Sequence, residues 1–117
     1  MNLLVTVVLI ANLQVTSYRS IPEQTDNSPF TTSIGERVHP HGLAVSQDLL
    51  KKNGGPLDYG DTVYIESIGF KVINDTMNPR HHVRADVWVA AYQHEKEFDK
   101  KYGKRKLKLW LVKPIIK

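Results

Sequence analysis

The stretch YGDTVYIESIGFKVINDTMNPR, Tyr59–Arg80, contains the clearest strand pattern of the chain. Two runs rich in β-branched and aromatic residues, Thr62–Ile65 and Phe70–Ile73, flank the short connection Ser67–Gly69. Runs of this composition favour strands, and a short connection that contains glycine favours their antiparallel pairing. The centre of the chain is therefore predicted to be a β-hairpin.

Further short elements are predicted on both sides of this hairpin. The predicted strands are Gln14–Tyr18, Gly42–Val45, Asp86–Ala90 and a last run from Lys106 in which Lys and Leu alternate. Gln47–Lys52 favours one helical turn, and Tyr92–Tyr102 favours a short amphipathic helix stopped by Gly103. The long polar stretch Ser20–Glu36 is expected to be a functional loop. Five or six short strands with one or two short helices predict an all-β fold, a small closed barrel.

Length and composition are those of one ordinary globular domain. The chain has 117 residues, 41% of them hydrophobic and 24% charged, and it contains no cysteine. Disulfides and thiolate metal sites are thus excluded. The net charge of +4 comes largely from lysines and Arg105 near the C-terminal end. Because these lysines alternate with leucine, they are expected on the solvent face of a strand, and no nucleic-acid partner is expected.

The first thirteen residues, MNLLVTVVLIANL, are apolar and uncharged. They are too short for a membrane-spanning helix but have the length of the apolar region of a secretory signal. No Lys or Arg precedes the run, however, and no clear cleavage site follows before Gln14. The β-branched residues equally favour a buried first strand. Residues 1–13 are therefore a signal-like segment or a first strand, followed by the barrel domain over 14–113.

Two aspartates eleven residues apart suggest acid chemistry. Asp75 lies in a polar run rich in Asn, Pro, Arg and His, whereas Asp86 opens the apolar run Val87–Val89. Two carboxyl groups in unlike settings at neighbouring strand ends are what the cleavage of a glycosidic bond requires. The single DTG-like motif at Asp75 has Met77 in place of glycine, which argues against an aspartic protease.

The histidines do not form a metal-binding pattern. His39 and His41 lie two apart and His81 and His82 are adjacent, so neither pair has the helical i, i+4 spacing. Turn histidines beside proline are more often simply exposed. No metal and no cofactor are expected.

The motifs resemble, in order, those of the three-aspartate (3D) domain family. They are VTSY (15–18), TDNSPFTTSIG (25–35), GLAVSQDLL (42–50), YGDTVYIESIGFKVINDTMNPR (59–80) and RADVWV (84–89). The resemblance covers about residues 15–112. It implies a six-stranded double-psi β-barrel similar to membrane-bound lytic transglycosylase A, rare lipoprotein A and expansins, and it implies cleavage or binding of cell-wall glycan.

The resemblance also implies which residues form the site. Asp86 corresponds in position to the catalytic aspartate of the transglycosylase barrel, and Asp75 corresponds to the second aspartate of the family. Many members read AVDP where this chain reads Ala44–Gln47, so either Ser46 replaces the first aspartate or Asp48 is its displaced equivalent. For Asp48 a cap of the following turn is the preferred role. The expected substrate-binding residues are Tyr18, Thr31 or its neighbour Thr32, Asp48, Asn78 and Arg80.

The implied reaction uses one working acid. A lytic transglycosylase protonates the bridging oxygen between N-acetylmuramic acid and N-acetylglucosamine and lets the muramyl 6-hydroxyl attack its own anomeric carbon. Asp86 is the candidate, and its pKa must rise about two units from about 3.9, through burial or the charge of Asp75. Asp75 is expected to support the site.

The expected partners are peptidoglycan glycan strands, bound by a monomer without a stable membrane span. The expected location is extracytoplasmic, in the periplasm, the cell wall or the medium, or on a phage. The alternative is an expansin-like module that binds glycan without cleaving it.

Overall fold

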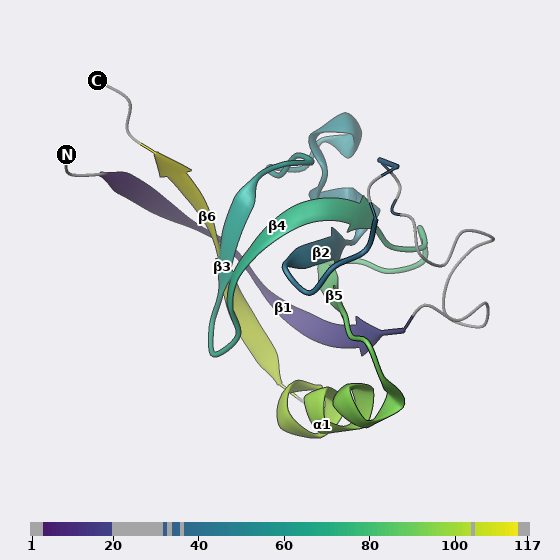
Figure 1. Ribbon diagram of the computed structural model, residues 1–117. Helices are drawn as coiled ribbons and strands as arrows, with labels where there is room; N and C mark the ends of the chain where they lie inside the picture. Colours follow the sequence, from purple (N-terminus) through teal and green to yellow (C-terminus); the bar gives the residue numbers. More distant parts are fainter. Residues whose placement is uncertain (1–3, 20–31, 33, 36, 104, 115–117) are drawn as a thin grey trace.

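The barrel is closed and is built from six short strands (Figure 1). The computed structural model describes residues 4–19, 32, 34–35, 37–103 and 105–114. The strands are β1 (Val5–Tyr18), β2 (Gly42–Val45), β3 (Thr62–Ile65), β4 (Gly69–Thr76), β5 (Arg84–Trp88) and β6 (Lys106–Pro114). The helices are the 3-10 turns η1 (Gln47–Leu49) and η2 (Lys51–Asn53) and the α-helix α1 (Tyr92–Tyr102). Over these residues the predicted all-β barrel is confirmed.

The strand order β1-β5-β2-β4-β3-β6 contains an internal two-fold relation. β1 pairs in parallel with β5 and antiparallel with β6, and β4 pairs in parallel with β2 and antiparallel with β3. Antiparallel β2–β5 and β3–β6 pairs join the two halves. Exchanging β1 with β4, β2 with β5 and β3 with β6 therefore leaves every pairing unchanged. Two equivalent halves that cross in this way form a double-psi β-barrel.

The core fills the barrel with one face of each strand. In β6 the residues Leu107, Leu109 and Leu111 are buried, while Lys106 and Lys108 between them are exposed, as the alternating sequence predicts. Each fully buried Leu, Ile or Val contributes about 1.5–3 kcal/mol relative to an exposed one. The other buried strand residues are Leu13, Val15, Leu43, Val45, Val63, Ile65, Ile73, Ala85 and Val87.

The two elements with local signals form as predicted. β3 and β4 are an antiparallel hairpin in which Tyr64 pairs with Phe70 and Ile65 with Gly69. α1 has the predicted bounds and packs against β1 with Tyr102 buried in the core. Gly103 follows the helix at its C-cap, where its N–H still donates to the carbonyl oxygen of Asp99 and a Cβ would lie 2.7 Å from that oxygen. Its own φ is −66°, so no left-handed turn is involved.

The first strand differs from the prediction. β1 runs without interruption over Val5–Tyr18, and the side chains of residues 5–9 are exposed rather than buried. This part of β1 pairs with the far end of β6, Val5 opposite Pro114, in a two-stranded ribbon that extends beyond the barrel (Figure 1). No core lies beneath it there. The predicted turn at Gln47–Lys52 is a pair of 3-10 turns, and most of the predicted loop Ser20–Glu36 lies outside the described residues.

Candidate active site

Both candidate acids lie within strands, which corrects the prediction of a loop and a strand start. β4 extends past Ile73 to Thr76 and so includes Asp75, because β2 pairs with it in parallel across a bulge. Asp86 is the central residue of β5. The strands are not neighbours, since β2 lies between them and Ala44 is opposite both aspartates. Their Cα atoms are thus two strand spacings apart, roughly 10 Å.

Asp86 lies on the outer face of the barrel, beside β1. Ala85 and Val87 point into the core, so the half-buried Asp86 and Trp88 point outward. The Thr16 hydroxyl on β1 donates a hydrogen bond of 2.9 Å to Asp86 Oδ1. Burial raises the pKa of Asp86 to about 6, against the opposing effects of this hydrogen bond and of the Arg84 charge. Asp86 thus changes its protonation state near pH 6.

Helix α1 adds two acids that the sequence analysis did not assign to the site. The charges of Asp99 and Glu95 also raise the pKa of Asp86. Glu95 is buried and forms a 3.5 Å ion pair with Arg19, and Asp99 accepts a 3.3 Å hydrogen bond from the Ser17 hydroxyl. A signal was present in the sequence, because Glu95 and Asp99 share the i, i+3, i+4, i+7 face of the helix with Phe98 and the buried Tyr102.

Tyr18 connects the two aspartates. Burial raises the pKa of its hydroxyl far above the usual range, and the charges of Asp75 and Asp86 act in the same direction. The hydroxyl is hydrogen-bonded to Asp75. Since β1 and β4 are separated by β5 and β2, the tyrosine ring spans the outer face of both strands to reach that carboxylate. The structure therefore brings Tyr18, Asp75 and Asp86 together.

A small apolar cluster lies beneath these polar groups. It consists of Tyr18, Ala44 and Met77, with half-buried Trp88 packed against it. Ala44, opposite both aspartates, has a side chain small enough to leave room for the tyrosine ring. Asp75 lies at the rim of this cluster, where the Thr76 backbone N–H donates a hydrogen bond of 2.8 Å to its Oδ1. The site thus has one partly free carboxyl, Asp86, and one anchored carboxyl, Asp75.

Ser46 and Asp48, the two candidates for the first family aspartate, both bind backbone. Ser46 is fully buried, and its hydroxyl accepts a 3.0 Å hydrogen bond from the Arg84 N–H. The Asp48 carboxylate accepts from the Val83 N–H at 3.1 and 3.3 Å and lies 3.9 Å from His82. The predicted capping role of Asp48 is wrong, since the cap position of η1 is Ser46. Asp48 instead fastens the segment before β5, where Val83 has a φ of 49°.

The remaining predicted binding residues lie in loops. Asn78 and Arg80 are exposed in the β4–β5 connection, where Asn78 Oδ1 accepts from the Arg80 N–H at 3.1 Å. Thr31 lies outside the described residues, and its neighbour Thr32 is buried. These contacts give Asn78 a turn-stabilising role.

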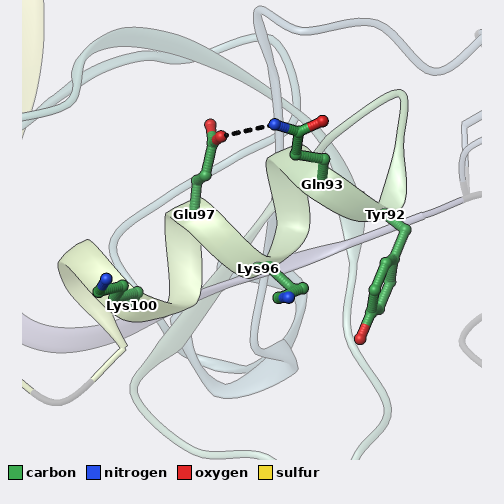
Figure 2. A pocket seen from close by; sticks show the side chains of 5 residues that line it. All are labelled: Tyr92, Gln93, Lys96, Glu97 and Lys100. Carbon is green, nitrogen blue, oxygen red and sulfur yellow. Dashed lines mark hydrogen bonds between the residues drawn. The ribbon is translucent and has the colours of Figure 1, made fainter.

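A shallow depression lies over the face of α1 that is drawn in Figure 2. By helical spacing this is not the face that carries Glu95 and Asp99. It is lined by Tyr92, Gln93, Lys96, Glu97 and Lys100, and Gln93 donates to Glu97 one turn along the helix. None of these residues belongs to the predicted site. Within the described part of the chain, no group of three or more His, Asp or Glu side chains is placed to hold a metal ion. None of the described helices has the length and apolar composition to cross a membrane.

No model of a known protein family and no curated protein matches this chain. The function is therefore inferred from the site itself.

Proposed function

We propose that this chain is a lytic transglycosylase-like enzyme of the 3D-domain type, which cleaves the bond between N-acetylmuramic acid and N-acetylglucosamine in peptidoglycan. The observation that carries the proposal is the raised pKa of Asp86, about 6, on an outer barrel face beside an aromatic cluster. An acid catalyst that works near neutral pH needs a carboxyl that still holds its proton there.

One carboxyl group performs both proton transfers in the proposed reaction. Asp86 gives its proton to the bridging oxygen as the bond from the muramyl anomeric carbon to that oxygen breaks. The muramyl 6-hydroxyl then attacks the same carbon and returns its proton to the Asp86 carboxylate. A 1,6-anhydro ring forms, and Asp86 ends in its starting state without the entry of water.

The position of Asp75 supports a single working acid. A glycosidase with two working carboxyl groups needs both of them open to the sugar, on either side of the bond that is cleaved. Here β2 lies between the strands that carry the two aspartates. The Asp75 carboxylate already accepts hydrogen bonds from the Tyr18 hydroxyl and the Thr76 N–H. Asp75 is then an anchor for Tyr18, and its charge stabilises positive charge that develops on the sugar.

Trp88 and Tyr18 supply the sugar contacts in this proposal. Trp88 is half-buried on the same outer face as Asp86, and Tyr18 packs beside it. Flat aromatic faces suit the apolar faces of sugar rings. Because the substrate is a cell-wall polymer, the protein is proposed to act outside the cytoplasm or as part of a phage.

The second candidate is a glycan-binding module without catalysis. The same aromatic cluster favours it, because Tyr18 and Trp88 form a binding surface whether or not Asp86 transfers a proton. The two functions differ in one observable, the release of soluble product.

The test uses purified protein and isolated sacculi, with soluble products identified by mass spectrometry. The enzyme proposal predicts 1,6-anhydromuropeptides from the wild type and none from Asp86→Asn, with circular dichroism unchanged. Glu97→Gln is the matched control, because it makes the same change at an exposed carboxyl on the far face of α1, and it is expected to retain full release. Binding to sacculi without any anhydro product would favour the second candidate, and Trp88→Ala is then expected to abolish binding.

A further inference from the structure

An uncharged apolar stripe crosses four strands on the side of the barrel opposite the site. Leu9 of β1 pairs with Trp110 of β6, Trp110 with Tyr64 of β3, and Tyr64 with Phe70 of β4. The Tyr64 ring lies 5.0 Å from that of Phe70 and 6.0 Å from that of Trp110, centroid to centroid. A second row lies alongside in register: Val7, Val112, Thr62 and Val72. We call these eight residues the outer stripe.

The outer stripe is a contiguous exposed apolar patch. Phe70 is 62% exposed and Val7 59%, and the core residues Leu109 and Leu111 alternate with the stripe on the other face of β6. With Val5, which lies on the same face of the ribbon, the exposed apolar side chains offer on the order of 500 Å², within the range of about 300–600 Å² for the largest patch of a typical monomer, a patch that is often functional. Two such stripes packed together would bury roughly 1,000 Å² in total, the size of a weak or transient interface.

The ribbon that carries part of the stripe is poorly supported by its own chain. Residues 5–9 of β1 pair with β6 on one side only, since β5 pairs with β1 from Gln14 onward. A two-stranded ribbon in water is marginally stable, and natural sheet edges are usually protected by charges or proline. β1 has neither between Val5 and Tyr18. The ribbon thus needs a covering surface.

We propose that the outer stripe is a homodimer interface, in which the stripe of one copy packs face to face on the same stripe of a second copy across a two-fold axis. The stripe contains no charged residue, so packing the stripes of two copies together buries no charge. The rings of Tyr64, Phe70 and Trp110 are tilted or edge-on to one another. Such an uneven surface is better suited to interlocking with side chains of another protein face than to stacking on a flat ligand. Since β6 and β3 lie across the barrel from β5 and β2, the dimer leaves the Asp86 face open. This inference does not rest on the proposed function.

The test measures the mass of the wild type by light scattering or sedimentation from about 1 µM to about 1 mM, the range of weak to moderate dimers. The expected result is a rise toward twice the chain mass of 13.3 kDa. Val7→Lys and Phe70→Lys each bury an unpaired ammonium in the dimer and are expected to weaken it at least about 100-fold. Both positions are exposed in the single chain, so folding, followed by circular dichroism, is retained.

Two controls separate this interface from general stickiness. Val8→Lys adds the same charge to the neighbouring exposed residue, which points to the other face of the ribbon, opposite the side of Val7. Tyr92→Lys alters an exposed aromatic on α1. Both are expected to dimerise like the wild type. Equal weakening by Val7→Lys and Val8→Lys would overturn the face-to-face assignment. A wild type that stays monomeric throughout, including one that instead floats with phosphatidylglycerol vesicles, would overturn the dimer.

Discussion

Replacement of Asp86 by Asn is expected to stabilise the fold at neutral and alkaline pH. The folded state holds the Asp86 proton more tightly than the unfolded chain, because burial raises its pKa from 3.8 to about 6. Stability therefore falls as pH rises between these two values, since the unfolded chain releases the proton first. About two pKa units at about 1.4 kcal/mol each give a cost of about 3 kcal/mol, fully present above about pH 6. Asparagine has no charge, and its Oδ1 still accepts the Thr16 hydrogen bond.

The assay is urea denaturation followed by tryptophan fluorescence, for wild type and Asp86→Asn across a pH series. Above about pH 7 the variant is expected to be more stable by up to about 3 kcal/mol, and the difference should shrink toward zero near pH 4. Glu97→Gln, at an exposed carboxyl, should show no such pH-dependent gain. If Asp86→Asn were no more stable than the wild type at pH 8, or if its gain were the same at pH 4, then burial would not raise the pKa of Asp86 in the folded state.

Three further variants test the neighbours of this carboxyl. Thr16→Val removes a hydrogen bond that lowers the pKa of Asp86, so the pH–rate profile of glycan cleavage is expected to move to higher pH. Thr16→Ser keeps the hydroxyl and should leave the profile in place. An unmoved profile for Thr16→Val would contradict the role of Asp86 as the catalytic acid. Tyr18→Phe removes the hydroxyl bonded to Asp75 and is expected to lower the free energy of unfolding by about 0.5–1.5 kcal/mol in urea titrations, an effect absent if the bond is unimportant. Ser46→Ala leaves a buried backbone N–H without its acceptor, so a loss of about 1–3 kcal/mol is expected by the same method, and an unchanged stability would speak against that bond.

Elements whose partners are close in sequence were predictable. The β3–β4 hairpin and α1 appear with nearly the predicted bounds, because their turn, periodicity and stop signal all lie within a few residues. The ends of β1 and β4 were not predictable in this way. β4 continues through Asn74 and Asp75, residues of low strand preference, because β2, some thirty residues earlier, pairs with Ile73 and Asp75 on either side of the bulge at Asn74.

Close packing between distant strands also explains Gly42. A Cβ at this position would lie 2.5 Å from the side-chain nitrogen of the buried Asn74. Glycine is needed there to let β2 approach β4. The requirement is invisible in the local sequence, where Gly42 reads as part of a buried strand.

The closeness of Tyr18, Asp75 and Asp86 agrees with the grouping expected from the sequence, whereas part of the electrostatics of Asp86 does not. Burial beside Val87 and Trp88 was expected to raise the pKa of Asp86, and burial is its largest cause. The second expected cause of the raised pKa was the charge of Asp75. The charges that act on Asp86 instead are those of Asp99 and Glu95 on α1. Their approach depends on how α1 packs against β1, which the sequence of the helix alone does not specify.

The pairing of β1 sets an order on folding. Both of its partners, β5 and β6, lie late in the chain, with Val5 opposite Pro114. During synthesis the β3–β4 hairpin can form early, but β1 has no partner until nearly the whole domain has left the ribosome. An uncharged, β-branched strand thus waits unpaired for most of translation. Its sequence makes it the segment on which chaperone binding and the risk of aggregation are expected to concentrate.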